Sequence, residues 1–497
     1  MRDQWRAPER NRRGDGRPTM TGAGAGRGIV SIVVAASLSC VFSAAHAETL
    51  ADAVAQAYRT NPTLAGARAQ LRVSDETLVQ AQEEYRPTAT VSGGATHQDI
   101  TSERYFSYQT ATVSVSQPVF TGGRVGSRIT AAQADLLSGR EELQRVESTV
   151  LLNVIQAYVD VRRDQQAIVV RQDNVRTLEQ EVEESRARFA GGAITRTDVA
   201  QSQAGLSAAR VQLAQAEGQL TVSQAAYAAV VGQPPQDLAA EPPLNGVPAN
   251  LNQALEAGEA SNPSLRGAKY AEQASHARVA EARAERLPSA SITASLGYEP
   301  IDALVPRSPY IRNFTAGASV SMPLYQGGSL NSRIRQALDR NNADEIAIEG
   351  ARRTMIHDLA QAWSQMLVAQ REIAEDHEQI EAAKIAFEGA QEEQRVGART
   401  TLEVLTAQQN LAAAELSLIT AGHDLYTAQA AILSLTGALK VDALAPAAPR
   451  YDPQKNLDRV SPRLWITPWT VIPEALDKGV SPVLDIPKPA KITEAGR

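Results

Sequence analysis

An internal duplication constrains the fold of this chain more than any other feature of its sequence. Residue types that mark the first half return in the same order in the second half. The matching groups are Asn61-Pro62 with Asn262-Pro263, Gly122-Gly123 with Gly327-Gly328, and Gly192 with Gly397. Self-similarity over so long a stretch indicates two copies of one structural unit. We therefore predict a first structural repeat over 48–250 and a second over 251–444.

Each repeat contains two segments in which apolar and small polar side chains alternate. The alternation is clear in the second repeat, over 289–298 and 314–322, and weaker in the first repeat. Such alternation predicts a strand with one apolar face and one polar face. Each pair of segments therefore predicts a β-hairpin, at about 88–118 in the first repeat and about 289–323 in the second.

Long helices are predicted after the strands, because proline is absent from 119–233 and from 324–445. The glycine pair Gly191-Gly192 marks a tight reversal within the first of these stretches. Before the reversal, apolar residues at three- and four-residue spacing over 143–161 and 175–182 favour a seam like that of a coiled coil. The sequence predicts helical hairpins at 122–232 and 327–437.

The lengths of these helices suggest how they pack. A single helix from Arg124 to Ala190 would be about 100 Å long, the returning helix 197–231 about 50 Å, and the opening helix 64–85 about 33 Å. Stacked end to end, the two short helices nearly match the long one. We expect a layer of long helices beside stacked pairs of short helices.

Four strands per chain are too few to close a membrane barrel, for which about eight are the minimum. An open sheet in lipid would leave backbone groups unpaired, each at a cost of several kcal/mol. Three chains would supply twelve strands. The predicted fold class is therefore mainly α with a membrane β-barrel: a duplicated strand hairpin plus long helical hairpin, with a trimer forming a 12-stranded barrel and a coiled-coil-like α-helical tunnel.

The two ends of the chain differ in character from the repeats. Residues 1–47 combine several arginines, an apolar run over 29–42 and the small-residue site Ala45-His46-Ala47, which predicts a cleaved signal peptide. Met20 is a second candidate start, and a lipoprotein signal would instead acylate Cys40. The tail, 445–497, is rich in proline and is predicted to be extended around the middle of the helices or partly disordered.

Composition excludes several classes of protein. The chain has 497 residues, a formal net charge of -7 and one cysteine, which argues against nucleic-acid partners and against disulfide or cysteine-based metal sites. No HExxH, GxSxG or phosphate-binding glycine motif stands in a suitable context. We expect no enzymatic activity, no cofactor and no resident metal.

With these features, the sequence resembles the TolC family of outer-membrane efflux and type I secretion proteins. The resemblance covers about 48–443, and its motifs lie at 61–64, 117–123 and 188–199 in the first repeat and at 323–328 and 396–400 in the second. It implies a homotrimer in the outer membrane, with its helical part in the periplasm. It also implies docking to a periplasmic adaptor protein and through it to an inner-membrane transporter of the ABC or RND type.

The resemblance further implies where the working residues lie. The tips of the helical hairpins would meet the adaptor, and the residues at these positions are Arg188, Gly191, Gly192, Ala193, Val396, Gly397 and Ala398. The simpler interpretation is that the glycines only permit a positive φ at a turn.

An entrance latch and a pore-lining acid are implied near the same tips. Arg399 would pair with Asp198 and approach Thr197, while Gln394 stands where the family pattern has a tyrosine. Glu403 would supply a ring of three carboxylates in a trimer. The alternatives are an ordinary solvated ion pair and an acid that complements a helix start.

A second hypothesis, of a different class, is a periplasmic or surface coiled-coil scaffold without a pore. Such a scaffold has no need of the alternating strands, which therefore favour the channel.

Overall fold

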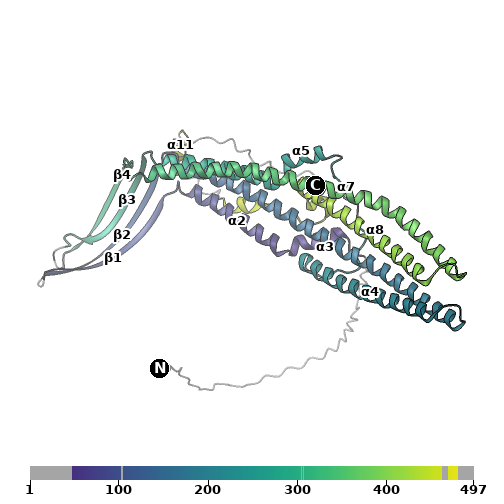
Figure 1. Cartoon of the computed structure of the whole chain (residues 1–497). Coiled ribbons are helices and arrows are strands. Elements are labelled where there is room, and N and C mark those ends of the chain that lie inside the picture. The colour runs from purple at the N-terminus through teal and green to yellow at the C-terminus, as the bar shows by residue number, and fades with distance from the viewer. Residues whose placement is uncertain (1–46, 102–103, 304, 306, 462–467, 480–497) are drawn as a thin grey trace, which may run out of the picture. The chain divides into compact units, whose positions relative to one another are not determined.

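The computed structural model describes residues 47–101, 104–303, 305, 307–461 and 468–479 (Figure 1). The predicted signal peptide lies outside these residues, apart from its last position. Within the described chain, the strands form a sheet at one end and the longest helices run from it to the opposite end (Figure 1).

The order of elements is the same in the two halves of the chain. The first half contains α1 (Leu50–Thr60), α2 (Pro62–Glu83), β1 (Thr88–Thr101), β2 (Arg104–Phe120), α3 (Arg124–Ala190) and α4 (Arg196–Val231). The second half contains α5 (Leu251–Ser261), α6 (Pro263–Ala284), β3 (Ser289–Pro300), β4 (Tyr310–Ser321), α7 (Ser329–Arg395) and α8 (Thr401–Leu435). The tail adds α9 (Val441–Leu444), α10 (Gln454–Val460) and α11 (Pro468–Lys478).

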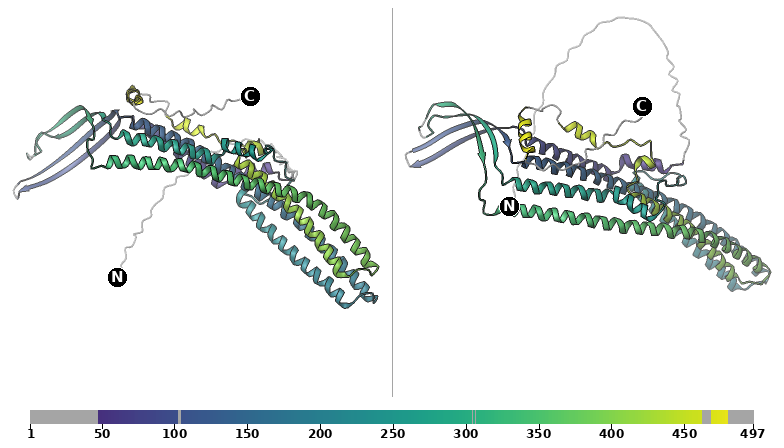
Figure 2. Two further views of the ribbon diagram at one scale, coloured as in Figure 1. Left: turned by 45° about the horizontal axis from the view of Figure 1, so that its top comes forward. Right: turned by 90° about the horizontal axis from the view of Figure 1, so that it is seen from above.

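The single long helix expected after each strand pair is confirmed. Helices α3 and α7 each have 67 residues. Near the sheet, α2, α3, α6 and α7 lie side by side in one layer, and farther away α4 and α8 take the places of the two shorter helices (Figure 2).

The four strands form one antiparallel sheet in the order β1-β2-β3-β4. Both predicted hairpins are confirmed, and the first ends at Phe120, close to the expected end at about 118. Pairing of β1 with β2 continues to Thr101 and Arg104, beyond the part where apolar side chains alternate. The reason is that the ladder is made by the backbone, which pairs regardless of side-chain polarity.

Two asparagines join the short helices end to end. The Asn61 side chain accepts a hydrogen bond from the Thr63 amide at the start of α2 and donates to the Val230 carbonyl at the end of α4, at 3.0 and 3.1 Å. Asn262 does the same between α6 and α8, donating to the Leu435 carbonyl at 2.9 Å. The stacking expected from helix lengths is thus fixed by the repeated Asn-Pro motif.

Replacing Asn262 by alanine should lower the free energy of unfolding by about 2–3 kcal/mol, because the change removes an N-cap and leaves a carbonyl without its donor. Asn250 is the matched control, since its side chain caps its own helix, α5, by accepting a hydrogen bond from the Gln253 amide at 2.9 Å. Its replacement should cost only about 1 kcal/mol. Denaturant unfolding followed by helical circular dichroism measures both, and equal losses would contradict the joint.

The C-terminal tail packs against the rest of the chain at two places. At the start of the tail, Ala445 and Ala448 are buried in the main hydrophobic core. Helix α11, however, lies against β2 and α3 at the base of the sheet. The expectation of an extended or disordered tail is therefore wrong for these helical parts, while residues 462–467 and 480–497 lie outside the described chain.

Candidate functional site

The two helical hairpins end in matching turns at the pole opposite the sheet. The amides of Gly192 and Ala193 donate to the last turn of α3, both at 2.9 Å, and those of Gly397 and Ala398 donate to the last turn of α7, at 3.0 and 2.8 Å. Gly192 and Gly397 have φ of 74° and 79°, and a Cβ on either would meet nothing within 4 Å. Glycine is therefore favoured here by backbone conformation and not by crowding.

Most of the predicted docking residues are exposed at these turns. They are Gly191, Gly192, Ala193, Val396, Gly397 and Ala398. Near the turns, Phe189 and Leu402 are further exposed apolar side chains, which the sequence analysis did not single out. These residues could have been recognised in the sequence, since an apolar residue beside a solvated turn has no helix to pack on.

The acids at the tips cap helices. The Asp198 carboxylate accepts hydrogen bonds from the amide and hydroxyl of Thr195, and Glu403 accepts the same pair from Thr400. These hydrogen bonds hold the pKa of each carboxyl below its usual range. Both acids therefore carry a negative charge at the N-terminus of a helix, where the helix dipole favours it.

The expected pair of Arg399 with Asp198 is not made within one chain. Arg399 donates instead to Glu393 at 2.5 Å, across the turn on its own hairpin. Asp198 is committed to its helix cap, and Thr197 is exposed beside it. A partner six residues away in the same turn is in reach before any contact between hairpins forms, which is why the pairing differs.

A buried polar bridge joins the two hairpins near the tips. Gln394 is 3% exposed, and its side-chain amide donates to Glu181 at 2.9 Å and to Thr401 at 3.3 Å. Arg188 donates to the Gln394 carbonyl at 2.8 Å, so this predicted docking residue is also part of the bridge. Glu181 and Thr401 were not recognised in the sequence, because nothing local distinguishes them.

Glu181 is held in an unfavourable environment for a charge. Burial raises the pKa of its carboxyl, and the hydrogen bond from Gln394 offsets this only in part. A buried carboxylate of this kind depends on its partner, because an unpaired buried charge is costly. The bridge is therefore sensitive both to substitution of Gln394 and to protonation of Glu181.

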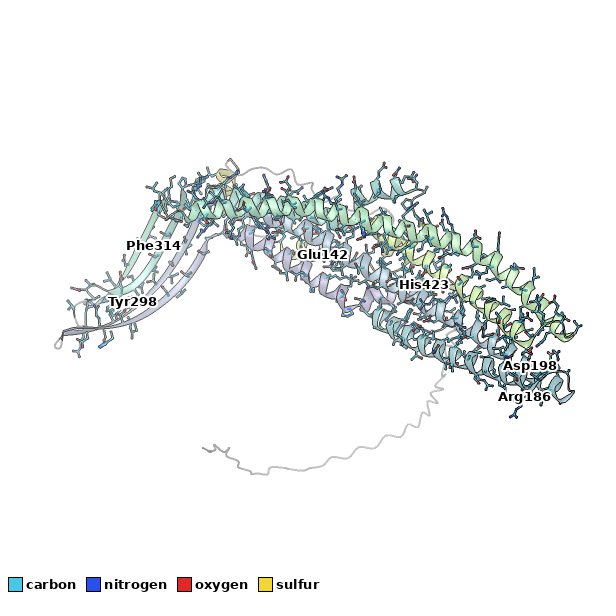
Figure 3. The ribbon with its side chains drawn as sticks, in the orientation of Figure 1. Glu142, Arg186, Asp198, Tyr298, Phe314 and His423 are labelled. Atoms are coloured by element: carbon cyan, nitrogen blue, oxygen red, sulfur yellow. The ribbon has the colours of Figure 1, made fainter. Side chains whose placement is uncertain are left out.

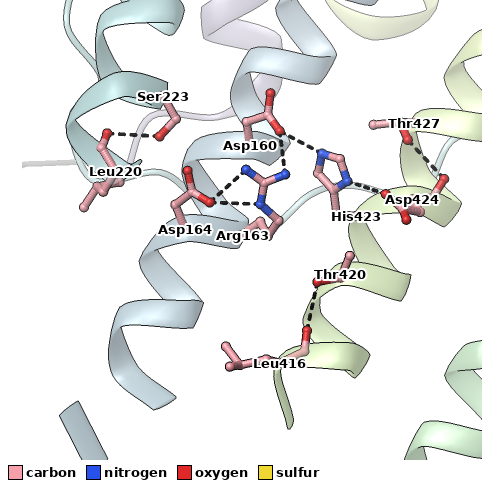
Figure 4. Close-up of polar contacts among 10 residues, drawn as sticks. All are labelled: Asp160, Arg163, Asp164, Leu220, Ser223, Leu416, Thr420, His423, Asp424 and Thr427. Atoms are coloured by element: carbon pink, nitrogen blue, oxygen red, sulfur yellow. Dashed lines mark hydrogen bonds and ion pairs between the residues drawn. The ribbon is translucent and has the colours of Figure 1, made fainter. Parts of the chain in front are cut away.

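Two further polar contacts join α3 to α8 between the tips and the middle of the helices. Gln408 donates to Asn174 at 3.2 Å, and both side chains are buried. Farther from the tips, His423 lies 2.9 Å from Asp160 and 2.8 Å from Asp424 (Figure 4). Figure 3 places His423 well away from Asp198, and Phe314 and Tyr298 at the sheet. The two hairpins are thus joined at several levels.

His423 binds its neighbours best when it is protonated. Burial alone would lower the pKa of its imidazole and Arg163 opposes its charge, but the hydrogen bonds to Asp160 and Asp424 together raise that pKa above 6.5. Arg163 also pairs with Asp160 at 3.0 Å and with Asp164 at 2.8 Å (Figure 4).

The stabilisation by His423 should therefore be complete below pH 6.5 and be lost as the pH rises through the raised pKa. We expect His423→Gln to cost about 1–2 kcal/mol of unfolding free energy at pH 6, and less at pH 8.5. Denaturant unfolding of both proteins at the two pH values measures this difference. His357, which is exposed beside Asp358, provides the control and should show no comparable change. A cost independent of pH would contradict the charged contact.

Neither a metal centre nor a membrane helix is found in the described chain. Within these residues, no three His, Cys, Asp or Glu side chains are grouped so that they could hold a metal ion. None of the helices described combines the length and apolar character required to cross a membrane.

Comparison with protein families gives a match over most of the chain. The model of the family described as outer membrane efflux protein covers residues 53–233 and 254–438, which include both repeated sets of strands and helices. The chain belongs to this family. Family members are channels and not enzymes, and the protein is accordingly an outer-membrane efflux channel with helices that extend into the periplasm.

Individual relatives agree with the family match. The chain is 30% identical over 418 residues to the outer membrane efflux protein BepC of Brucella suis, covering 84% of this chain and 91% of BepC. It is 23% identical over 369 residues to the alkaline protease secretion protein AprF of Pseudomonas aeruginosa, covering 73% and 76%. The fold matches the outer membrane protein VceC of Vibrio cholerae with a TM-score of 0.68, 20% identity and coverage of 78% and 96%. The hypothesis of a scaffold without a pore is set aside by this family.

Proposed function

We propose that three copies of this chain form a passive exit duct, in which their sheets close a 12-stranded barrel and their helices form a periplasmic tunnel. The duct would receive substrates from an inner-membrane transporter of the ABC or RND type through a periplasmic adaptor. Residues 1–47 would direct export and be removed, leaving the repeats at 48–250 and 251–444 and the tail from 445. The efflux and secretion roles in the names of BepC and AprF fit such a duct.

The open sheet is the observation that carries this proposal. The strand order leaves β1 and β4 as the two edges within the chain. Exposed apolar residues stand on one face of the sheet, among them Val113, Leu296, Phe314 and Val320. A sheet with a lipid-facing surface needs partners for both edges, and pairing β4 of one copy with β1 of the next supplies them.

The hairpin tips are the proposed adaptor contact. Their glycine turns allow close approach, and the exposed Phe189, Val396 and Leu402 offer apolar surface at the same pole. Exposed apolar groups next to small residues fit a helical partner that packs between the hairpins.

The proposed entrance is closed by the Gln394 bridge within each chain. Thr197 and Arg399 are exposed and Asp198 is half-buried, and in the proposed trimer these residues would add contacts between neighbouring copies. Glu403 would place a charged carboxylate from each copy at this level, which favours cations at the entrance.

Single-channel recording of the purified protein in a planar bilayer tests the proposal, together with cross-linking of its oligomers. We expect trimers and small, discrete, long-lived openings. Replacing Val91 on β1 by aspartate should prevent insertion, because it places a charge on the predicted lipid face, whereas Val222→Asp on α4 should not. A monomer that inserts, or a folded trimer without openings, would overturn the proposal.

A further inference from the structure

Helix α11 is fixed to the base of the sheet by a buried carboxylate. Asp477 is 0% exposed and accepts hydrogen bonds from the Tyr85 hydroxyl at 3.1 Å and the Thr121 amide at 3.0 Å, as well as from the Thr121 hydroxyl. Tyr85 precedes β1 and Thr121 follows β2. The helix is therefore held where the strands end and the long helices begin.

The other side of α11 is apolar and uncovered in the single chain. Val471, Ile472 and Leu476 are 50%, 56% and 50% exposed, while Pro473 and Asp477 are buried against the body. An amphipathic helix of this composition is typical of segments that lie in the plane of a membrane surface.

The position of α11 is at the edge of the apolar surface of the sheet. On β2, the apolar-face residues Val113 and Val115 are 45% and 39% exposed, but exposure falls from Gln117 to Phe120, at the end of the strand that meets α11. The alternate residues Thr112 and Ser114 on the other face are half-buried along the same stretch. The fall in exposure where β2 meets α11 indicates that the helix borders the exposed apolar part of the sheet.

The remaining surface at this level is also apolar. Met322, Leu324 and Tyr325, directly after β4, are 51%, 89% and 86% exposed. Figure 1 shows α11 beside the strands, at the end of the helical layer opposite the hairpin tips. Since the helices extend into the periplasm, the base of the sheet is its periplasmic rim.

We infer that α11 is an interfacial helix, which inserts Ile472 and Leu476 among the headgroups and upper acyl chains of the periplasmic phospholipid leaflet of the outer membrane. The occupant of its exposed face is therefore lipid. The interfacial position of α11 follows from the outer-membrane location and the contacts of this helix, and is independent of the proposed trimer. Asp477 anchors the helix at the level of the periplasmic end of the sheet.

Spin labels on single cysteines test this inference directly. The full chain is prepared with Cys40→Ala, and Ile472→Cys or Leu476→Cys is labelled with a nitroxide and reconstituted into phosphatidylethanolamine–phosphatidylglycerol vesicles. Phe314→Cys on the apolar face of the sheet is the lipid control, and Val222→Cys, on exposed α4, is the water control. Collision with oxygen reports lipid, and collision with a water-soluble nickel chelate reports water.

We expect the ratio of oxygen to nickel collisions at both α11 positions to exceed that at Val222 severalfold and to approach that at Phe314. A ratio equal to that at Val222 would overturn the inference, because α11 would then face water. Low collision with both reagents would also overturn it, because a second copy or another part of the protein would then cover the helix.

Substitution of Asp477 provides an independent arm. In the Asp477→Asn protein labelled at Ile472, we expect the label to become more mobile and its depth in the bilayer to change, while the label at Phe314 keeps its spectrum. An unchanged spectrum at Ile472 would contradict the role of Asp477 in anchoring α11.

Discussion

Replacing Gly437 by alanine should lower the free energy of unfolding by about 3 kcal/mol or more, as the sum of a strained backbone and a collision. Gly437 has a φ of 68°, directly after α8. A Cβ at this position would lie 2.5 Å from the carbonyl oxygen of Ser261 and 3.2 Å from its carbonyl carbon. Backbone atoms cannot turn aside as a flexible side chain can, and Ser261 adjoins the Asn262 joint between α8 and α6. The collision would therefore disturb the end-to-end stacking of the second repeat.

Gly397→Ala is the matched control for this prediction. Gly397 has a φ of 79°, but a Cβ there would meet nothing within 4 Å. Its replacement should cost only the strain, about 1–2 kcal/mol. Denaturant unfolding followed by far-ultraviolet circular dichroism compares the two proteins. If both substitutions cost the same, close approach at Gly437 has no energetic role.

Removing the Gln394 side chain should shift the channel toward its open state. The Gln394→Ala change breaks the buried hydrogen bond to Glu181, which joins the two hairpins within a chain, and the bond to Thr401 inside the second hairpin. A lost buried bond to a charged group is worth about 1–3 kcal/mol, which corresponds to roughly a 5–150-fold shift in the ratio of open to closed channels. Recordings of single channels in a planar bilayer measure this ratio.

Arg395→Ala is the control, because Arg395 pairs with Glu392 on the same helix and joins nothing across the hairpins. It should leave the openings unchanged. A second observable is the pH: since burial raises the pKa of Glu181, acidification should protonate it and favour the closed bridge. Glu181→Gln should abolish that dependence. Openings of Gln394→Ala that match those of the unaltered channel would show that the bridge does not hold the entrance.

Features made by neighbours in the sequence were predictable. The absence of proline and the regular apolar spacing predicted α3 as one helix from Arg124 to Ala190, and the structure has the same bounds. The turn glycines and the alternating strands of the second repeat were equally clear. Helix, turn and strand preferences depend on contacts within a few residues, so they can be recognised without knowledge of the fold.

The location of the candidate site could be predicted from the sequence, but the contacts within it could not. Its location at the hairpin turns followed from Gly192, Gly397 and the family resemblance. Its internal contacts did not, because Glu181 and Gln394 are separated by 213 residues and meet only when the two helical hairpins pack together. Within one chain, a closer acid on the same turn, Glu393, accepts the hydrogen bond from Arg399, so the expected pairing of Arg399 with Asp198 stays a prediction.

The position of the tail was decided by tertiary structure alone. Its short helices have local signals, but no local rule brings Asp477 to Tyr85, which lies 392 residues earlier in the chain. A buried carboxylate is stable only where several donors converge, and these donors come from two different ends of strands. The sequence by itself therefore determined the repeated helices, turns and hairpins, whereas packing between distant segments decided which polar groups meet and where α11 lies.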